Sequence, residues 1–331
     1  MNILLTGIAG FLGSHVAEAL LARGHQVTGL DDLSGGFARN VPAGAHFVKG
    51  SVCNYALVRT LFKAHNYDAV YHLAAYAAEG LSHFIRRFNY ENNVLGSINL
   101  INGAIESKSG KKFVFTSSIA VYGHNATAGA KEGDPTIPID PYGCAKLAVE
   151  HDLHAAAEMF GLNYTIFRPH NIVGPRQHIG DKYRNVAGIF MNQTLKGEPL
   201  TIFGDGLQKR AFSYVSDVVT PMVECLEFDA TDYETFNVGG RQPYTVLALA
   251  EIVQRVSGVN TGIVFLPPRN EAKIAYCDHA RVDRVFGVHP SVRLEDGLAR
   301  MWEWAKKLGP QEPTVAPEIE AGTGRLPESW R

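Results

Sequence analysis

The sequence has little net charge and few cysteines. Its 331 residues carry a formal net charge of -2, which gives no electrostatic reason to expect binding to nucleic acid or to an anionic membrane surface. The four cysteines lie far apart, at positions 53, 144, 225 and 277, without the close spacing of a disulfide framework or a zinc site. We therefore expect reduced thiols in a cytoplasmic protein and no bound metal.

Long apolar runs and internal repeats are also absent from the sequence. No apolar stretch reaches the length that a membrane-spanning helix needs, and residues 1–5 already read as a strand, which leaves no room for a signal peptide before it. The length suits one large domain or two closely joined domains. These features predict a globular protein.

A glycine-rich turn follows the first predicted strand, residues 3–5. Gly7, Gly10 and Gly13 are spaced by two residues each, and a helical pattern of apolar residues begins directly afterwards. A buried strand, a glycine turn and a helix N-terminus form the first half of a dinucleotide-binding unit. The glycines let the backbone approach a pyrophosphate, and the first N–H groups of the helix attract its charge. We predict a dinucleotide site at this turn.

Two acids, Asp31 and Asp32, end the next predicted strand, residues 26–30. An acid about twenty residues beyond the glycine turn is placed to accept hydrogen bonds from the adenosine ribose. A carboxylate at that point repels a 2′-phosphate, so Asp31 favours NAD over NADP. The alternative is that both acids only begin the turn that leads to Gly35 and Gly36.

Predicted strands and helices alternate along the first half of the chain. Strands are predicted at 46–48, 68–73, 112–115 and 163–169, with helices at 55–65, 94–105 and 142–160. Alternation of this kind predicts an α/β fold, a doubly wound parallel (Rossmann) sheet over residues 1–168. Ligands bind at the carboxyl ends of such strands, where Asp31, Ala74 and Ser118 all fall.

Residues after Pro169 contain more Gly and Pro and shorter predicted elements. Strands are predicted at 200–203 and 236–238 and helices at 247–257 and 294–307. We interpret residues 169–308 as a smaller α/β substrate-binding region, with the return of some of its strands or helices to the Rossmann core left open. Residues 309–331 are rich in Pro, Gly and Glu and are predicted to form a mobile tail or a strap across the surface.

A tyrosine and a lysine, Tyr142 and Lys146, lie four residues apart on the helix that Pro141 opens. Four residues are about one helical turn, so both side chains leave the same face. A nearby ammonium favours the phenolate and lowers the pKa of the phenol, and the pair can then act as an acid/base device. The spacing is common, and an amphipathic helix with an aromatic and a solvated lysine is the alternative.

Several motifs occur in an order that strengthens the catalytic interpretation. They are Thr6-Gly7-x-x-Gly10-Phe11-Leu12-Gly13, Asp31, Ser117-Ser118-x-x-Val121-Tyr122-Gly123, Tyr142-x-x-x-Lys146, Arg168-Pro169-x-Asn171-x-x-Gly174-Pro175 and Gly197-x-Pro199-Leu200-Thr201-Ile202-Phe203-Gly204-Asp205-Gly206. Together they resemble the extended short-chain dehydrogenase/reductase family. Within it they look most similar to NAD-dependent nucleotide-sugar epimerases of the UDP-galactose 4-epimerase type, from the first residue to roughly Lys307.

The resemblance implies a role for each matching residue. Tyr142 is the implied catalytic base, with Lys146 and Ser118 beside it. The residues implied to bind NAD are Gly7, Gly10, Phe11, Leu12, Gly13, Asp31, Asp32, Ser51, Val52, Leu73, Ala74, Ala75, Asn92, Thr116, Tyr142, Lys146 and Pro169. Those implied to bind a UDP-sugar are Ser117, Ser118, Tyr142, Asn171, Arg184, Arg210 and Arg269. A homodimer through the helix before Ser118 and the helix of Tyr142 is also implied.

Two residues after Ser118 distinguish among related reactions. The 4,6-dehydratases of this family carry an acid pair there and the UDP-glucuronate decarboxylases a glutamate, whereas this sequence has Ile119 and Ala120. Neither side chain transfers protons, so the resemblance favours simple 4-epimerisation through a 4-keto intermediate. A different class of function, an NAD-binding regulator without turnover, remains the alternative.

The sugar is less clearly specified. UDP-glucose/UDP-galactose is favoured, since His178 stands where one type of UDP-glucuronate epimerase has an arginine. UDP-glucuronate remains open, because Arg176, Lys182 or Arg184 can supply a cation for its carboxylate. UDP-N-acetylhexosamine also remains open, because the position that limits the C2 substituent in relatives aligns with Ala275 or Tyr276. Further departures from the family pattern are Ser51 in place of an aspartate, Ala77 in place of a lysine and Ala211 after Arg210.

Overall fold

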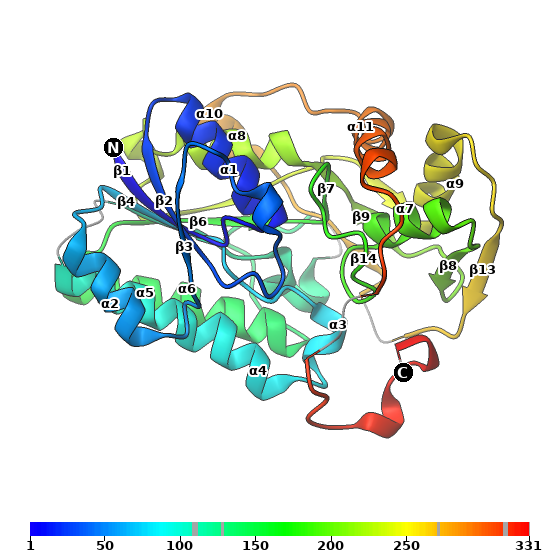
Figure 1. The fold of residues 1–331 in the computed structure, drawn as a ribbon, viewed down its shortest axis with the longest axis horizontal. Coiled ribbons are helices and arrows are strands. Elements are labelled where there is room, and N and C mark those ends of the chain that lie inside the picture. Colours follow the sequence, from blue (N-terminus) through cyan, green and yellow to red (C-terminus); the bar gives the residue numbers. More distant parts are fainter. Residues whose placement is uncertain (108–111, 127–128, 270–271, 314–316, 331) are drawn as a thin grey trace.

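The larger lobe is built on one parallel sheet of seven strands (Figure 1). The computed structural model describes residues 1–107, 112–126, 129–269, 272–313 and 317–330. The strands run in the order β11-β6-β5-β4-β1-β2-β3. Their bounds are β1 Asn2–Thr6, β2 Gln26–Asp31, β3 His46–Lys49, β4 Ala69–His72, β5 Lys112–Thr116, β6 Tyr164–Pro169 and β11 Glu234–Val238. Every neighbouring pair is parallel, so the predicted doubly wound Rossmann fold is confirmed.

Helices cover both faces of this sheet, as Figure 1 shows. Residues alternate between the faces: Ile3 and Leu5 of β1 pack on one side and Leu4 on the other, which is the pattern of a parallel strand buried on both faces. One face carries α1 (Phe11–Ala22), α8 (Val215–Glu224) and α10 (Ala280–Phe286). The other carries α2 (Tyr55–Ala64), α5 (Gly96–Ser107) and α6 (Pro141–Phe160).

The order of the strands places a switch point beside β1. From β1 the chain moves outward to β2 and β3 and then returns to β4 on the other side of β1. Thr6, the last residue of β1, pairs with Leu30 of β2 and with His72 of β4. A crevice forms where the connections diverge to opposite faces, so the glycine turn after Thr6 opens into the place where a ligand is expected.

The smaller lobe has its own core. Two helices, α7 (Val186–Lys196) and α9 (Val246–Ser257), pack with α11 (Leu294–Leu308) around Phe190, Leu249 and Trp302. Short strands border them: β8 (Leu200–Phe203) pairs with β13 (Ile263–Leu266), β9 (Lys209–Ala211) pairs with β12 (Pro243–Thr245) and β14 (Ile274–Ala275), and β7 (Ile172–Val173) pairs with β10 (Ser213–Tyr214). Three elements of residues 169–308 instead belong to the larger lobe, namely β11, α8 and α10.

The helix of Tyr142 and Lys146 begins where the sequence indicates. Asp140 precedes it, and its carboxylate accepts a hydrogen bond from the N–H of Gly143 at 2.8 Å, which satisfies one of the unpaired donors of the first turn. Gly161 ends the helix in the left-handed conformation. Several helices were not predicted. In the first half of the chain these are α3 (Glu79–Ser82), α4 (Arg86–Tyr90) and the π-helical turn Glu91–Leu95, which continues into α5; after Pro169 they are α7, α8 and α10.

Residues 317–330 lie across the surface instead of extending away from it. In Figure 1 this segment, drawn in red, passes below α3 and α4 and turns back toward α3. Trp330 is buried in a cluster with Ala78, Leu81 and Ile85. Within the described parts of the chain, the helices are all too short or too polar to cross a membrane.

Candidate active site

A cleft of about 370 Å³ opens at the carboxyl ends of the sheet strands. Every residue that the resemblance implies for NAD lines it, from the glycine turn through Asp31 and Ala74 to Lys146 and Pro169. Of the residues implied for the UDP-sugar, the lining includes Ser117, Ser118, Tyr142, Asn171 and Arg184. The fold therefore brings together the ends of six strands, β1 to β6, and the loop between β7 and α7.

Two arginines implied for the UDP-sugar do not line this cleft. Arg210 lies on β9, where its Nη1 donates to the carbonyl of Lys209 at 2.9 Å. The guanidinium of Arg269 lies 4.6 Å above the centre of the Phe203 ring. Both belong to the smaller lobe, and their role in binding the diphosphate stays a prediction.

The glycine turn leaves no room for side chains. Gly7 has a φ of 79°, and a Cβ on it would lie 2.8 Å from the backbone nitrogen of Ala74. A Cβ on Gly13 would lie 2.0 Å from the carbonyl oxygen of Gly7. The turn therefore packs closely against α1 and against the residues that follow β4. Because these glycines carry no side chain, a pyrophosphate in the cleft can approach the backbone of the turn.

Asp31 is fixed beside the turn by backbone groups. Its Oδ2 accepts a hydrogen bond from the N–H of Ala9 at 2.9 Å, and its Oδ1 accepts one from Leu33 at 2.8 Å. Burial raises the pKa of this carboxyl group, and the two N–H donors oppose that effect. These bonds hold the carboxylate at the end of β2, where it can accept hydrogen bonds from the hydroxyls of a ribose.

Three residues that line the cleft each have a buried polar atom without a hydrogen bond in the described chain. Thr116 Oγ1, Gln177 Oε1 and His178 Nδ1 are buried and have no hydrogen-bond partner among the described residues, and all three residues line the cleft. Buried polar groups are normally hydrogen-bonded, so we expect these atoms to bind a polar ligand in the cleft. Together with the bare glycine turn and Asp31, these atoms fit a dinucleotide. The sequence did not single out Gln177.

Tyr142 and Lys146 meet beneath the cleft as predicted. Lys146 Nζ donates a hydrogen bond to the carbonyl of Thr116 at 2.8 Å and lies 5.8 Å from the centre of the Tyr142 ring. Burial raises the pKa of Tyr142, and a hydrogen bond from Ser118 lowers it. Burial also lowers the pKa of Lys146 to about 7. Burial therefore favours the neutral form of each group, and the pKa of Lys146 lies near neutral pH.

Ser118 is oriented so that its hydroxyl can donate. Its Oγ accepts a hydrogen bond from the N–H of Ala120 at 3.1 Å, as the cap of the short 3₁₀-helical segment Ile119–Asn125. With an N–H already bound to the oxygen, the hydroxyl proton is free to bond to Tyr142 or to a sugar oxygen. Ser118 and Tyr142 together form a donor and an acceptor facing one point of the cleft.

A buried ion pair lies one helical turn behind Lys146. Glu150 is 2 % exposed, and its carboxylate accepts hydrogen bonds from Arg168 Nε at 3.0 Å and Nη2 at 2.5 Å. Ser117 donates to the same carboxylate. The negative charge of Glu150 raises the pKa of Lys146 against the effect of burial. Sequence reasoning missed Glu150, although its place four residues after Lys146 was a usable signal.

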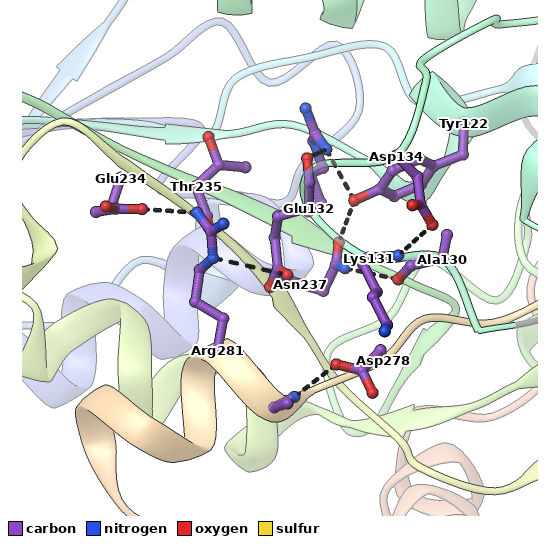
Figure 2. A network of polar contacts seen from close by, with 12 residues as sticks. Tyr122, Ala130, Lys131, Glu132, Asp134, Glu234, Thr235, Asn237, Asp278 and Arg281 are labelled. Carbon is purple, nitrogen blue, oxygen red and sulfur yellow. Dashed lines mark hydrogen bonds and ion pairs between the residues drawn. The ribbon is translucent and has the colours of Figure 1, made fainter.

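The Glu150–Arg168 pair is held by a larger polar network, part of which Figure 2 shows. Arg168 Nη1 donates to the hydroxyl of Tyr122 at 2.8 Å, and that hydroxyl donates to Asn237 at 2.8 Å. The backbone N–H of Asn237 donates to Glu132 at 2.9 Å, and Arg281 lies 3.8 Å from the other oxygen of Glu132. The network joins β6, β11 and α10 and so fixes the strand end that carries Arg168.

We expect turnover to rise with pH through about 7. The base form of the Tyr142–Lys146 pair has lost one proton, and burial lowers the pKa of Lys146 to about 7. Below that value the pair holds both protons, so kcat should fall about tenfold per pH unit. A pH profile of kcat at saturating substrate checks this, with the acid limb of Lys146→Met expected at higher pH, because Tyr142 then lacks the ammonium that favours its phenolate. A flat profile between about pH 5 and 9 would contradict the assignment.

Comparison with known proteins agrees with this geometry. Residues 3–239 match the model of the NAD dependent epimerase/dehydratase family. The chain belongs to this family. Its cofactor is therefore NAD, as predicted, and the prediction of an extended short-chain dehydrogenase/reductase of the nucleotide-sugar epimerase kind is confirmed.

Individual relatives cover almost the whole chain. A UDP-glucose 4-epimerase of Halalkalibacterium halodurans is 32% identical in an alignment of 323 residues that covers 93% of this chain and 96% of the relative. A solved UDP-glucose 4-epimerase of Thermotoga maritima superposes with a TM-score of 0.88 at 35% identity, over 93% of this chain and 99% of that one.

A third relative acts on a charged sugar. The UDP-glucuronic acid 4-epimerase of Bacillus cereus, solved with UDP-glucuronic acid and NAD, has a TM-score of 0.85 at 30% identity, over 93% of this chain and 100% of that one. The prediction of an isomerase that depends on NAD is confirmed by these relatives, whereas they differ in the sugar.

Proposed function

We propose that this protein is a UDP-sugar 4-epimerase that interconverts UDP-glucose and UDP-galactose. The observation that carries the proposal is the meeting of Tyr142, Lys146 and Ser118 at one end of the cleft. Tyr142 takes the proton of the C4 hydroxyl while Ser118 donates a hydrogen bond to the same oxygen. When bound, NAD⁺ supplies the acceptor for the C4 hydride and later returns it.

Inversion follows if the 4-keto sugar presents its other face before the hydride returns. Tyr142 then gives its proton back to the new C4 oxygen, so the residues end the cycle as they began. Lys146 stays protonated while Tyr142 is a phenolate and stabilises that charge. Glu150 lies behind Lys146 and favours its protonated form.

The residues after Ser118 support epimerisation over elimination. Ile119 and Ala120 occupy the positions that carry acids in dehydratases, and their side chains cannot transfer a proton. One carboxylate of α3, Glu79, does line the cleft, and it raises the pKa of Tyr142. A 4-keto-6-deoxy product would overturn the proposal and make Glu79 the group to replace.

Charge pairing in the loop 176–184 supports a neutral sugar. Arg184 Nε lies 2.5 Å from Asp181, which is 2 % exposed, and Arg176 lies 2.7 Å from Glu18. Lys182 lies over the ring of Tyr183 at 5.3 Å. A C6 carboxylate would therefore compete with carboxylates already in place, while Glu79 in the same cleft would repel it.

We expect kcat/KM for UDP-glucose to exceed that for UDP-glucuronate by about tenfold or more, which corresponds to about 1.4 kcal/mol. Separate assays with UDP-glucose, UDP-glucuronate and UDP-N-acetylglucosamine measure this. The variants Arg184→Gln and Arg176→Gln test two of the candidate cations separately, because both arginines are paired and line the cleft. A loss confined to UDP-glucuronate in Arg184→Gln would favour the uronate alternative.

Two other outcomes bear on the remaining alternatives. Preference for the N-acetyl sugar would point to the segment of Ala275 and Tyr276, neither of which lines the described cleft. No epimer from any of the three sugars, with NAD bound, would support a regulator without turnover. A homodimer through α5 and α6 stays a prediction of the family resemblance, and a cytoplasmic location stays a prediction from the cysteine spacing.

A further inference from the structure

The segment of residues 317–330, which we call the strap, is bound to the larger lobe at its first half. The backbone N–H groups of Glu320 and Ala321 donate to the carbonyl of Phe84 at 2.8 and 3.3 Å. The Glu320 carboxylate accepts hydrogen bonds from the N–H groups of Arg87 at 2.6 Å and Phe88 at 2.8 Å. Four hydrogen bonds thus fix the strap to the start of α4.

At the other end of the strap, Trp330 is 7 % exposed. Its ring lies against the bare backbone of Gly80, where a Cβ would come within 2.8 Å of the ring. The ring of Tyr183 meets it edge to face at 5.3 Å, and the guanidinium of Arg269 lies 5.8 Å from its centre. Trp330 therefore contacts α3, the loop before α7 and the loop after β13.

Two of these three contacts adjoin residues that line the cleft. Glu79, next to Gly80, lines the cleft, and so do Tyr76 and Phe88 of the same hydrophobic cluster. Arg184, next to Tyr183, lines it as well. Figure 1 shows the strap turning back beside α3 on the side of the smaller lobe. One aromatic side chain thus connects cleft-lining segments of both lobes.

We propose that Trp330 is a positioning residue for the UDP-sugar: it holds α3, the Tyr183–Arg184 loop and Arg269 in the spacing that the sugar nucleotide needs. The proposal rests on the proposed function. Aromatic rings bury large areas and bind arginine faces, so one ring can join three segments that are far apart in the sequence. The contacts of Trp330 and Glu320 described above do not involve the glycine turn or Asp31, so we expect NAD binding to be independent of the strap.

Calorimetric titration of the NAD-loaded protein with UDP tests the proposal. We expect Trp330→Ala to weaken UDP binding by about tenfold or more, which corresponds to about 1.4 kcal/mol. The KM for UDP-glucose should rise while kcat changes less, and the NAD content should match the wild type. Trp330→Phe should recover only part of the UDP affinity, because a phenyl ring keeps an aromatic face for Tyr183 but lacks the outer edge of the indole that lies against Gly80. UDP affinity in Trp330→Ala within about twofold of the wild type would overturn the proposal.

A second pair of variants covers the case in which Trp330→Ala does not fold. Glu320→Gln loosens the first half of the strap, and Glu318→Gln is the matched control, since Glu318 is exposed and has no recorded polar partner in the described chain. Weaker UDP binding in Glu320→Gln alone supports the proposal, and equal binding in both variants overturns it. Failure of the proposed function would appear in the wild type, as no UDP binding, and would overturn both proposals.

Discussion

Replacing Tyr142 by phenylalanine is expected to lower kcat by about 10³-fold, within the range that general acid–base groups contribute. The phenol oxygen is the proposed acceptor of the C4 proton, and Phe has no atom in its place. The ring itself is 6 % exposed and packs in the fold, so the variant should keep its structure. NAD content, measured after release from the denatured protein, should be unchanged.

Tyr55→Phe is the matched control for this variant. Tyr55 lies on α2 and is 40% exposed, and its hydroxyl makes one long contact of 3.5 Å to Glu106. Removal of that hydroxyl should leave kcat within about twofold of the wild type, as is usual for a surface change. If Tyr142→Phe turns over within about tenfold of the wild type, another group is the base.

Replacing Gly13 by alanine is expected to remove most of the bound NAD. The new Cβ would lie 2.0 Å from the carbonyl oxygen of Gly7 and 3.3 Å from the Cα of Ile8, so the turn must move away from α1. Overpacking of this kind costs about 1–3 kcal/mol, and we expect NAD affinity to fall about tenfold or more. Absorbance of the released cofactor and a titration with NAD measure the effect.

Gly133→Ala serves as the control for the glycine turn. No atom lies within 4 Å of a Cβ built on Gly133, and its φ is not in the left-handed region. That variant should bind NAD as the wild type does and show the same melting temperature. Gly13→Ala purified with a full complement of NAD would contradict the assignment of the turn to the pyrophosphate.

The NAD half of the cleft could be predicted because it depends on local signals. A strand, a glycine turn and a helix are adjacent in the sequence, and Asp31 follows at the spacing of one βαβ step. Right-handed parallel connections then leave few possible arrangements. Consequently the predicted residues from Gly7 to Pro169 all line one cleft, although they come from widely separated parts of the chain.

Contacts between distant segments could not be predicted in the same way. The pairing of Glu150 with Arg168 and the placement of Gln177 over the cleft depend on how β6 and the following loop pack. The short helices α3 and α4 carry no strong periodicity, so the position of Glu79 beside Tyr142 was not foreseen. Nothing local indicates that Trp330 packs on Gly80, because that contact joins residues about 250 positions apart.

The sequence by itself determined the alternating fold, the glycine turn, Asp31 and the Tyr142–Lys146 pair, because each is a pattern within a few residues or one structural repeat. It also determined that Ile119 and Ala120 offer no acid. The tertiary structure alone decided which charges of the 176–184 loop are already paired, where β11 joins the sheet and how the strap closes on α3. These features depend on packing between segments far apart in the chain, which local patterns do not encode.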